Sequence, residues 1–308
     1  MSVSVKNHKS PTIQEALRHG ASVLAHACDA PDIDSRFLLA RALGQPETTS
    51  MYAHSEELLT PAQWKLFGTY LIQRAAGKPL AYLLGSWEFY GREFFITEDV
   101  LVPRPSTEDL VDTALDAIEQ MYKKSDRKIT VADVGCGSGC IAVTLALESP
   151  LIETIYATDI SPAALKIAAK NIERYKLQDR IQLLEGNMLD PLAGLPIDLI
   201  VSNPPYIPTK ELNEASRPAP PTAAKASAGK RGVRFKSETV GLGFEPRIAL
   251  DGGPDGMKYT SVIQAAPLPH VMETQQGHIE TVLKKNAPGF SPEARETISN
   301  RQLAADHQ

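Results

Sequence analysis

The sequence lacks any long hydrophobic run. No apolar stretch approaches the roughly 20 residues that a helix needs to span a bilayer. The first ten residues, Met1–Ser10, have neither the apolar centre of a signal peptide nor the arginine-rich pattern of a transit peptide. We therefore expect a cytoplasmic protein with no membrane partner.

Cysteine is scarce as well. The chain has three cysteines, Cys28, Cys136 and Cys140, too few for a disulfide framework. Cys136 and Cys140 have no companion ligands at the spacing of a zinc site. We expect reduced thiols in a cytosol-like compartment and no bound metal.

Positive charge is not in excess. The 32 lysines and arginines are outnumbered by 37 acidic residues, which gives a formal net charge of −5. No global positive field therefore favours non-specific binding to nucleic acid, although a local basic patch remains open. We expect no direct nucleic-acid partner. The composition, 43% hydrophobic and 22% charged, is that of a globular protein.

Residues 1–84 show a series of short amphipathic patterns with helix signals at their ends. Thr12 is a capping residue before an apolar repeat, Gly44 closes the next repeat, and Thr60-Pro61 begins another. The pattern predicts a small helical domain over residues 1–84.

The character changes at residue 85. The stretch Trp87–Ile96 is aromatic and β-branched around Gly91, which predicts a β-hairpin in a linker over residues 85–105. Ser106 and Thr107 then begin a predicted helix.

From Lys128 onward, predicted strands and helices alternate. The strands are Ile129–Val134, Thr154–Thr158, Ile181–Leu184 and Ile197–Ser202, and the helices are Cys140–Glu148 and Pro162–Tyr175. Such alternation is typical of an α/β protein with a doubly wound, Rossmann-like parallel sheet. Ligands of these sheets bind beyond the carboxyl ends of the strands.

Two segments interrupt this organisation. Residues 215–240 are rich in proline, alanine, glycine and lysine and show no apolar periodicity, which predicts a flexible, locally basic insertion. A solvated loop is favoured there over a contact with an acidic partner. The strand-and-helix domain is predicted over 106–290, and the polar tail 291–308 is predicted to be frayed.

The strongest local pattern is a glycine-rich loop between a strand and a helix, Asp133-Val134-Gly135-Cys136-Gly137-Ser138-Gly139. Glycines there let the backbone turn sharply and approach a ligand beside a helix N-terminus. A dinucleotide fingerprint needs glycine at the sixth place, where Cys140 stands. The compact spacing instead fits the amino acid and nucleoside of S-adenosyl-L-methionine. We predict cofactor contacts from Asp133, Gly135, Cys136, Gly137, Ser138 and Gly139, with a plain tight turn as the alternative.

Two further strand ends carry polar residues. Asp159 ends the second strand, where a carboxylate can accept hydrogen bonds from both ribose hydroxyls; a helix cap is the alternative. Asn187 and Met188 follow the third strand. We predict that Asn187 contacts the adenine amino group and Met188 covers the ring, although Asn187 also suits a simple turn.

The fourth strand leads directly into Asn203-Pro204-Pro205-Tyr206. The prolines fix backbone angles, so their carbonyl groups point in preset directions. The Asn203 amide offers a donor and an acceptor, and Tyr206 offers a ring for stacking. This arrangement suits methylation of an amide or amino nitrogen, whose poorly nucleophilic lone pair must be aligned with the methyl donor. The cofactor brings the electrophile, so no metal is required. We predict that all four residues bind substrate and serve catalysis, and that Asn203 also contacts the cofactor.

Together with these residues, several blocks of sequence closely resemble the HemK/PrmC family of release factor glutamine methyltransferases. The blocks are Gly77–Gly85, Glu88–Gly91, Leu101–Glu108 with its proline-arginine-proline run, the glycine loop, Asp159, the Asn203–Tyr206 motif and Glu245–Gly256. The Asn203–Tyr206 motif alone is shared with adenine and guanine amino-methyltransferases. The Leu101–Glu108 and Glu245–Gly256 blocks are more specific to the family.

The resemblance implies a class I methyltransferase fold that uses S-adenosyl-L-methionine. It implies that a glutamine in a Gly-Gly-Gln loop of a peptide chain release factor enters the Asn203 pocket, and that the helical domain docks that partner. Arg104 is assigned to substrate binding in the same way, and we expect a monomer.

The chain departs from the family at three places. The family usually has aspartate and an aromatic residue where this chain has Asn187 and Met188, and the insertion is longer than expected. The closing elements are matched only in degraded form by Pro267–Gln276, and Glu273 has no partner that the sequence identifies.

Two alternatives to a release factor methyltransferase stay open. One is an amino-methyltransferase that acts on RNA or DNA bases, which the shared Asn203–Tyr206 motif would serve. The other is a non-catalytic relative that binds a cofactor or partner, which the atypical C-terminal region suggests.

Overall fold

The computed structural model describes residues 10–45, 50–215, 241–275 and 278–283. The predicted insertion, apart from Ala215, and the predicted tail 291–308 lie outside these residues. The chain divides into two compact units. Residues up to Gly85, with Gly241–Phe244, form the first unit; Ser86–Ala215 and the residues from Glu245 onward form the second.

The first unit is helical, as the amphipathic patterns predict. Its helices are α1 (Ile13–Leu24), α2 (Pro31–Leu43), α3 (Ser50–Ala53), α4 (Pro61–Ala75) and α5 (Leu80–Leu84). Capping boxes at Thr12 and Thr60 begin α1 and α4, because each threonine and the residue three positions on satisfy one another's backbone N–H groups. Leu24, Leu38 and Phe67 are fully buried in the core between the helices.

The second unit begins with the predicted hairpin. Strands β1 (Ser86–Phe89) and β2 (Arg92–Phe95) pair antiparallel. Tyr90 and Gly91 between them both have positive φ, the conformation of a tight hairpin turn. The hairpin belongs to the same compact unit as the sheet.

A six-stranded sheet follows, with the order β5-β4-β3-β6-β7-β8. The strands are β3 (Ile129–Val134), β4 (Ile152–Asp159), β5 (Ile181–Glu185), β6 (Leu199–Ser202), β7 (His270–Glu273) and β8 (Ile279–Val282). All neighbouring pairs are parallel except β7 and β8. The predicted doubly wound sheet is confirmed, and the strand order reverses beside β3, where such sheets bind ligands.

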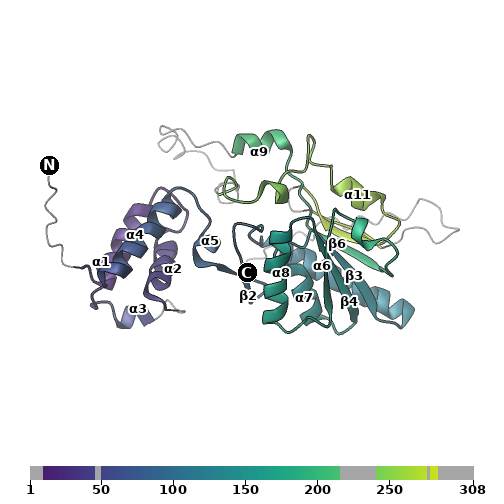
Figure 1. Cartoon of the computed structure of the whole chain (residues 1–308), viewed down its shortest axis with the longest axis horizontal. Helices are drawn as coiled ribbons and strands as arrows, with labels where there is room; N and C mark the ends of the chain where they lie inside the picture. Colours follow the sequence, from purple (N-terminus) through teal and green to yellow (C-terminus); the bar gives the residue numbers. More distant parts are fainter. Residues whose placement is uncertain (1–9, 46–49, 216–240, 276–277, 284–308) are drawn as a thin grey trace, which may run out of the picture. The chain divides into compact units, whose positions relative to one another are not determined.

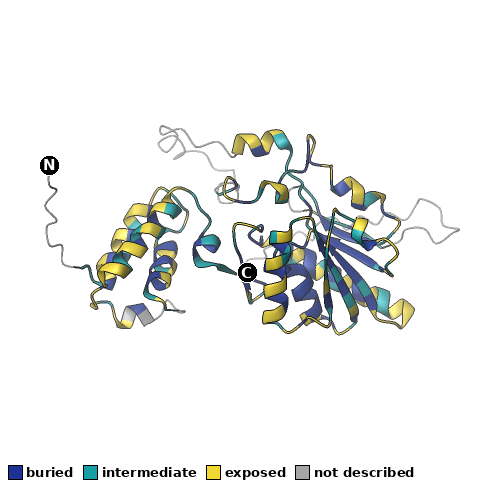
Figure 2. Ribbon diagram, viewed as in Figure 1, coloured by how far each residue is buried: buried dark blue, intermediate teal, exposed yellow. Residues whose placement is uncertain are grey.

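Long helices cover one face of this sheet (Figure 1). They are α6 (Ser106–Ser125), α7 (Cys140–Glu148) and α8 (Pro162–Arg174). The other face packs against shorter elements, namely α11 (Thr260–Ala265) and the 3₁₀ turn η1 (Asp190–Leu192), through residues such as Ile263 and Leu192. Figure 2 shows the resulting layers, with buried strands beneath helices that are exposed only on their outer sides.

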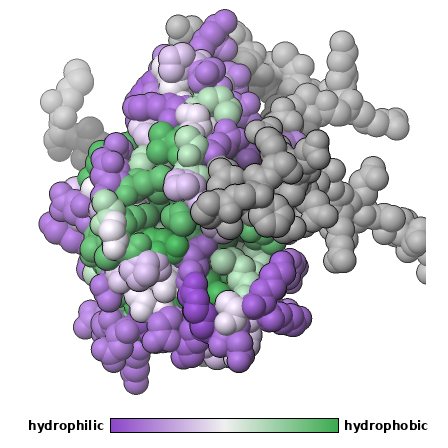
Figure 3. Space-filling model, turned by 90° about the vertical axis from the view of Figure 1, so that its right-hand side faces the viewer, coloured by the Kyte–Doolittle hydropathy of each residue, from purple (hydrophilic) through white to green (hydrophobic). Residues whose placement is uncertain are grey.

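Six short elements of the second unit were not predicted: helices α9 (Thr209–Ala215) and α11, the 3₁₀ turns η1 and η3 (Arg247–Ala249), and strands β7 and β8. None of the described helices has the length and apolar character needed to cross a membrane. The face of the molecule in Figure 3 nevertheless carries a cluster of hydrophobic surface bordered by hydrophilic residues.

Candidate active site

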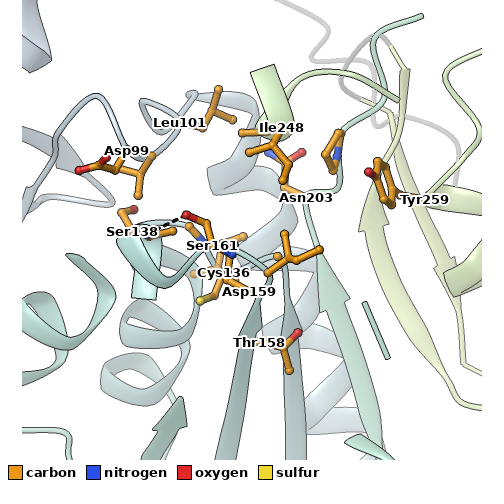
Figure 4. Close-up of a pocket in the computed structure, with 18 of the residues that line it drawn as sticks. Asp99, Leu101, Cys136, Ser138, Thr158, Asp159, Ser161, Asn203, Ile248 and Tyr259 are labelled. Carbon is orange, nitrogen blue, oxygen red and sulfur yellow. Dashed lines mark hydrogen bonds between the residues drawn. The ribbon is translucent and has the colours of Figure 1, made fainter. Parts of the chain in front are cut away.

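A pocket opens at the carboxyl ends of four parallel strands of the second unit (Figure 4). Its empty space, which includes open solvent at the mouth, is about 960 Å³. Nine of the residues that the sequence singles out line it: Gly135, Cys136, Gly137, Ser138, Asp159, Asn187, Met188, Asn203 and Pro205. The wall does not include Asp133, Gly139, Pro204, Tyr206 or Arg104.

Two positions in the glycine loop require glycine for different structural reasons. Gly137 has a φ of 54°, and a Cβ atom built there meets nothing within 4 Å, so the space above it is open to a ligand. Gly139 has a φ of 76°, and its Cβ atom would lie 3.2 Å from the Ala168 side chain. The first position leaves room in the pocket, and the second lets the loop pack closely on α8.

Asn171 ties this loop to the hairpin from beneath. Its side chain is fully buried on α8. The amide nitrogen donates to the Ser138 carbonyl at 2.8 Å, and the amide oxygen accepts from the Phe95 N–H at 2.7 Å. A buried amide with such partners fixes the loop's position at little cost.

Asp159 links the loop to the end of β4. Its carboxylate accepts hydrogen bonds from the Gly137 and Ser161 N–H groups, each at 2.9 Å. Burial raises the pKa of Asp159, while these backbone donors oppose the rise. Ser161 itself caps α8, since its hydroxyl accepts from the Ala164 N–H at 3.2 Å. Asp159 therefore stands on the pocket wall with a carboxylate that two amides hold in place.

Asp133 lies behind the loop rather than in the pocket. The residue is fully buried, and its Oδ2 atom accepts from the Ala142 N–H in the first turn of α7 at 3.1 Å. Its Oδ1 atom has no hydrogen-bond partner among the described residues. Burial raises the pKa of Asp133 to about 7. The contact predicted between Asp133 and the cofactor stays a prediction.

This raised pKa predicts a pH dependence of stability. Burial favours the protonated carboxyl, so its contribution to the free energy of unfolding is present below the ordinary pKa of 3.8 and is lost as pH rises to about 7. Asp133→Asn does not titrate. Between pH 4 and pH 8, the free energy of unfolding of wild type should therefore fall by at most about 4 kcal/mol relative to that of Asp133→Asn. Urea unfolding at several pH values measures this difference. Parallel pH curves for the two proteins would contradict this account.

Asn203 stands directly beyond β6 on the same edge of the sheet. Its Nδ2 atom donates to the Thr107 hydroxyl at 3.0 Å. Pro204 is buried behind it, and Pro205 faces the pocket. Tyr206 points elsewhere, because its hydroxyl donates to Glu273 at 3.1 Å. Stacking of Tyr206 on a substrate group stays a prediction.

Glu273 corrects the expectation that this residue has no identifiable partner. Its carboxylate is fully buried and accepts hydrogen bonds from the hydroxyls of Ser106, Thr107 and Tyr206 at 3.0, 3.0 and 3.1 Å. Burial raises its pKa, and the three hydroxyl donors work against that rise. The only sequence signal was an acidic residue at the end of an apolar segment.

The Glu245–Gly256 block supports the Asn203–Tyr206 motif. The backbones of Ile207 and Asp251 form a bridge, in which the Gly252 N–H donates to the Ile207 carbonyl at 2.8 Å. A Cβ atom on Gly252 would lie 2.8 Å from the Tyr206 backbone, and one on Gly256 would lie 2.4 Å from the Tyr206 carbonyl oxygen. Only glycine permits this close approach.

Arg104 forms an ion pair with Glu245 instead of lining the pocket. The Glu245 side chain is 1% exposed and also accepts from the Val102 N–H at 3.2 Å. Burial raises the pKa of Glu245, and the Arg104 guanidinium opposes the rise. Arg104 thus anchors the extended segment before α6, and its contact with substrate stays a prediction.

The two thiols at the loop are free and buried. Burial raises the pKa of Cys140 to about 12 and that of Cys136 well above its ordinary value. Both remain protonated and are poor nucleophiles. Within the described part of the chain, no three histidine, cysteine or acidic side chains are grouped as a metal site requires.

A family model of the N-terminal region and several similar proteins point to the same family. Residues 15–85 match the model of the PrmC N-terminal domain, and residues 107–217 match the methyltransferase small domain. The release factor glutamine methyltransferase of Moorella thermoacetica is 39% identical over 249 residues, which are 80% of this chain and 77% of that protein. The enzyme of that name from Geobacter sulfurreducens is 37% identical over 76% of this chain and 72% of that protein. The one from Bacillus subtilis is 36% identical over 80% of this chain and 77% of that protein.

Proposed function

Because the chain belongs to the release factor glutamine methyltransferase family, we propose that it methylates the side-chain amide nitrogen of a glutamine in a peptide chain release factor. The methyl donor is S-adenosyl-L-methionine, and the glutamine is the one in the Gly-Gly-Gln motif. The fold is that of a class I methyltransferase with a helical N-terminal domain.

The orientation of the Asn203 amide is the observation that carries this proposal. Its Nδ2 group is committed to Thr107, so its Oδ1 atom is the part of the amide left to accept a hydrogen from a substrate. A glutamine side chain presents two such hydrogens on one planar nitrogen. Asn203 lines the same pocket as the glycine loop and Asp159, which brings the acceptor to the cofactor site (Figure 4).

The residues of the pocket fit S-adenosyl-L-methionine. The open space above Gly135 and Gly137 leaves room for its amino-acid arm against the backbone. Asp159 would hold the ribose hydroxyls, and Asn187 with Met188 would hold the adenine. When bound, this cofactor supplies an electrophilic methyl group on a sulfonium centre.

The protein's own contribution is to place the nitrogen. The lone pair of an amide is delocalised, so the nitrogen attacks only when it is aligned with the methyl group and free to become pyramidal. Asn203 Oδ1 accepts one N–H, and a carbonyl of the rigid Pro204-Pro205 pair accepts the other. These preset acceptors require no reorganisation during the reaction.

We extend the proposal to the domains, the oligomeric state and the location. We assign docking of the release factor to the helical domain over residues 1–84 and catalysis to the sheet domain over 106–290. The protein acts as a monomer in the cytoplasm on a protein rather than a nucleic acid. Size measurement by light scattering of the purified chain, alone and with release factor, tests the oligomeric assignment.

Methyl transfer from labelled S-adenosyl-L-methionine tests the proposal against its alternatives. Purified protein is incubated with a release factor, with the same factor carrying Gln→Ala in its Gly-Gly-Gln motif, and with RNA and DNA. Label is expected only in the unaltered release factor. Label confined to nucleic acid would establish a base methyltransferase, and cofactor binding with no transfer would establish a non-catalytic relative.

A further inference from the structure

The Asn203 amide is connected to a buried carboxylate through one hydroxyl group. Asn203 Nδ2 donates to Thr107 Oγ1 at 3.0 Å, and Thr107 Oγ1 donates to Glu273 Oε2 at 3.0 Å. Thr107 is 3% exposed and Glu273 is fully buried. These residues come from three elements, since Thr107 lies on α6, Asn203 follows β6 and Glu273 ends β7.

The chain of hydrogen bonds has a fixed direction. An ionised carboxylate only accepts hydrogen bonds, so the single hydroxyl hydrogen of Thr107 is directed to Glu273. The Thr107 oxygen then has only acceptor capacity left for Asn203. Of the two ends of the Asn203 amide, only the NH₂ end can donate a hydrogen bond to the Thr107 oxygen. The carboxylate therefore determines, through the hydroxyl, which end of Asn203 is turned away from Thr107.

We propose that Glu273 and Thr107 are positioning residues that lock the Asn203 amide with its oxygen presented to the substrate. This inference rests on the proposed function and deepens it, because it explains how the site distinguishes an amide from an acid. A glutamine amide donates hydrogens to Oδ1. The carboxylate of a glutamate at the same place has no hydrogen to donate and meets the oxygen unfavourably.

Glu273 is suited to this role because its other oxygen is also engaged. Glu273 Oε1 accepts from the Ser106 and Tyr206 hydroxyls at 3.0 and 3.1 Å. The carboxylate is thus held from α6 on one side and from the Asn203–Tyr206 motif on the other. Rotation of the carboxylate would break several buried hydrogen bonds at once, which makes the orientation costly to change.

Replacement of the Thr107 hydroxyl is the direct test. Thr107→Val keeps the shape of the side chain and removes the hydroxyl, while Thr107→Ser keeps the hydroxyl. Thr113→Val makes the same change on an exposed part of α6, where the Thr113 hydroxyl donates to the Asp109 carbonyl within the same helix. We measure kcat, KM for release factor, and the dissociation constants of the factor with Gly-Gly-Gln and of its Gln→Glu form.

We expect Thr107→Val to lose about 10²-fold in kcat and to bind the glutamine and glutamate forms with similar affinity. Thr107→Ser should restore most of the rate and the preference for glutamine, and Thr113→Val should match wild type. If Thr107→Val keeps both kcat and the preference, the proposal is overturned. It is also overturned if valine and serine at position 107 lower kcat equally, since that pattern indicates loss of packing rather than of polarity.

Glu273→Gln provides a second variant of unchanged shape. The amide oxygen of a glutamine belongs where two hydroxyls donate, near Ser106 and Tyr206, so its NH₂ group faces Thr107 and reverses the direction of the chain. We expect a loss of kcat and of glutamine preference similar to that of Thr107→Val. A fully active Glu273→Gln enzyme would refute the proposal.

Wild-type protein serves as the reference for both proposals. If wild type methylates no release factor, the proposed function fails. If wild type and the variants are all active, only the positioning role is refuted.

Discussion

Asn203→Ala is expected to lose about 10²–10³-fold in kcat while binding S-adenosyl-L-methionine nearly as well as wild type. Truncation removes the acceptor that orients the glutamine nitrogen, whereas the glycine loop and Asp159 on the cofactor side are untouched. Single-turnover methyl transfer gives the rate, and calorimetry gives the cofactor affinity.

Asn213→Ala is the matched control for that variant. Asn213 lies on α9, where its side chain accepts from Arg247 at the surface, and we expect near wild-type turnover. A near-normal rate for Asn203→Ala would contradict the amide-holding role. So would a loss that is confined to cofactor binding.

Gly252→Ala is expected to lower kcat by about 10²-fold and to destabilise the fold by about 1–3 kcal/mol. The added Cβ atom would lie 2.8 Å from the Cα and carbonyl carbon of Tyr206. Because these are backbone atoms, they cannot rotate away as the end of a flexible side chain can. The whole Asn203–Tyr206 motif must therefore shift to relieve the contact. Methyl transfer and thermal unfolding measure the two effects.

Gly194→Ala separates this clash from an ordinary glycine effect. Gly194 has a φ of 80°, and a Cβ atom there meets nothing within 4 Å. Its replacement should lower stability by about 1 kcal/mol through backbone strain and leave kcat unchanged. If Gly252→Ala behaves like Gly194→Ala, the Glu245–Gly256 block does not support the motif as described.

The convergence of the glycine loop, Asp159 and Asn203 on one pocket was predictable because it depends on local pattern. Gly135, Asp159 and Asn203 each follow a strand that the apolar runs identify, and parallel strands bring their carboxyl ends to one edge. Once the strands were predicted, it followed that these three residues lie close together. Short elements such as α9 were missed because seven residues carry too little periodicity to detect.

The support behind Asn203 was not predictable, because it depends on contacts between distant parts of the chain. Thr107 and Glu273 are 166 residues apart, and in the sequence Thr107 is indistinguishable from a residue that opens a helix. Arg104 similarly finds Glu245 at a separation of 141 residues. Such pairings are set by which strand β7 joins and by which helix packs over it, neither of which a local pattern encodes.

Locating the transferred methyl group within the release factor tests the central claim most directly. After reaction of the purified chain with S-adenosyl-L-methionine and an unmodified release factor, peptide fragmentation by mass spectrometry assigns the methyl group to one residue and one atom. The account predicts methylation of the side-chain amide nitrogen of the Gly-Gly-Gln glutamine, with none in the Asn203→Ala reaction. Methylation at any other residue, or equal methylation by Asn203→Ala, would contradict it.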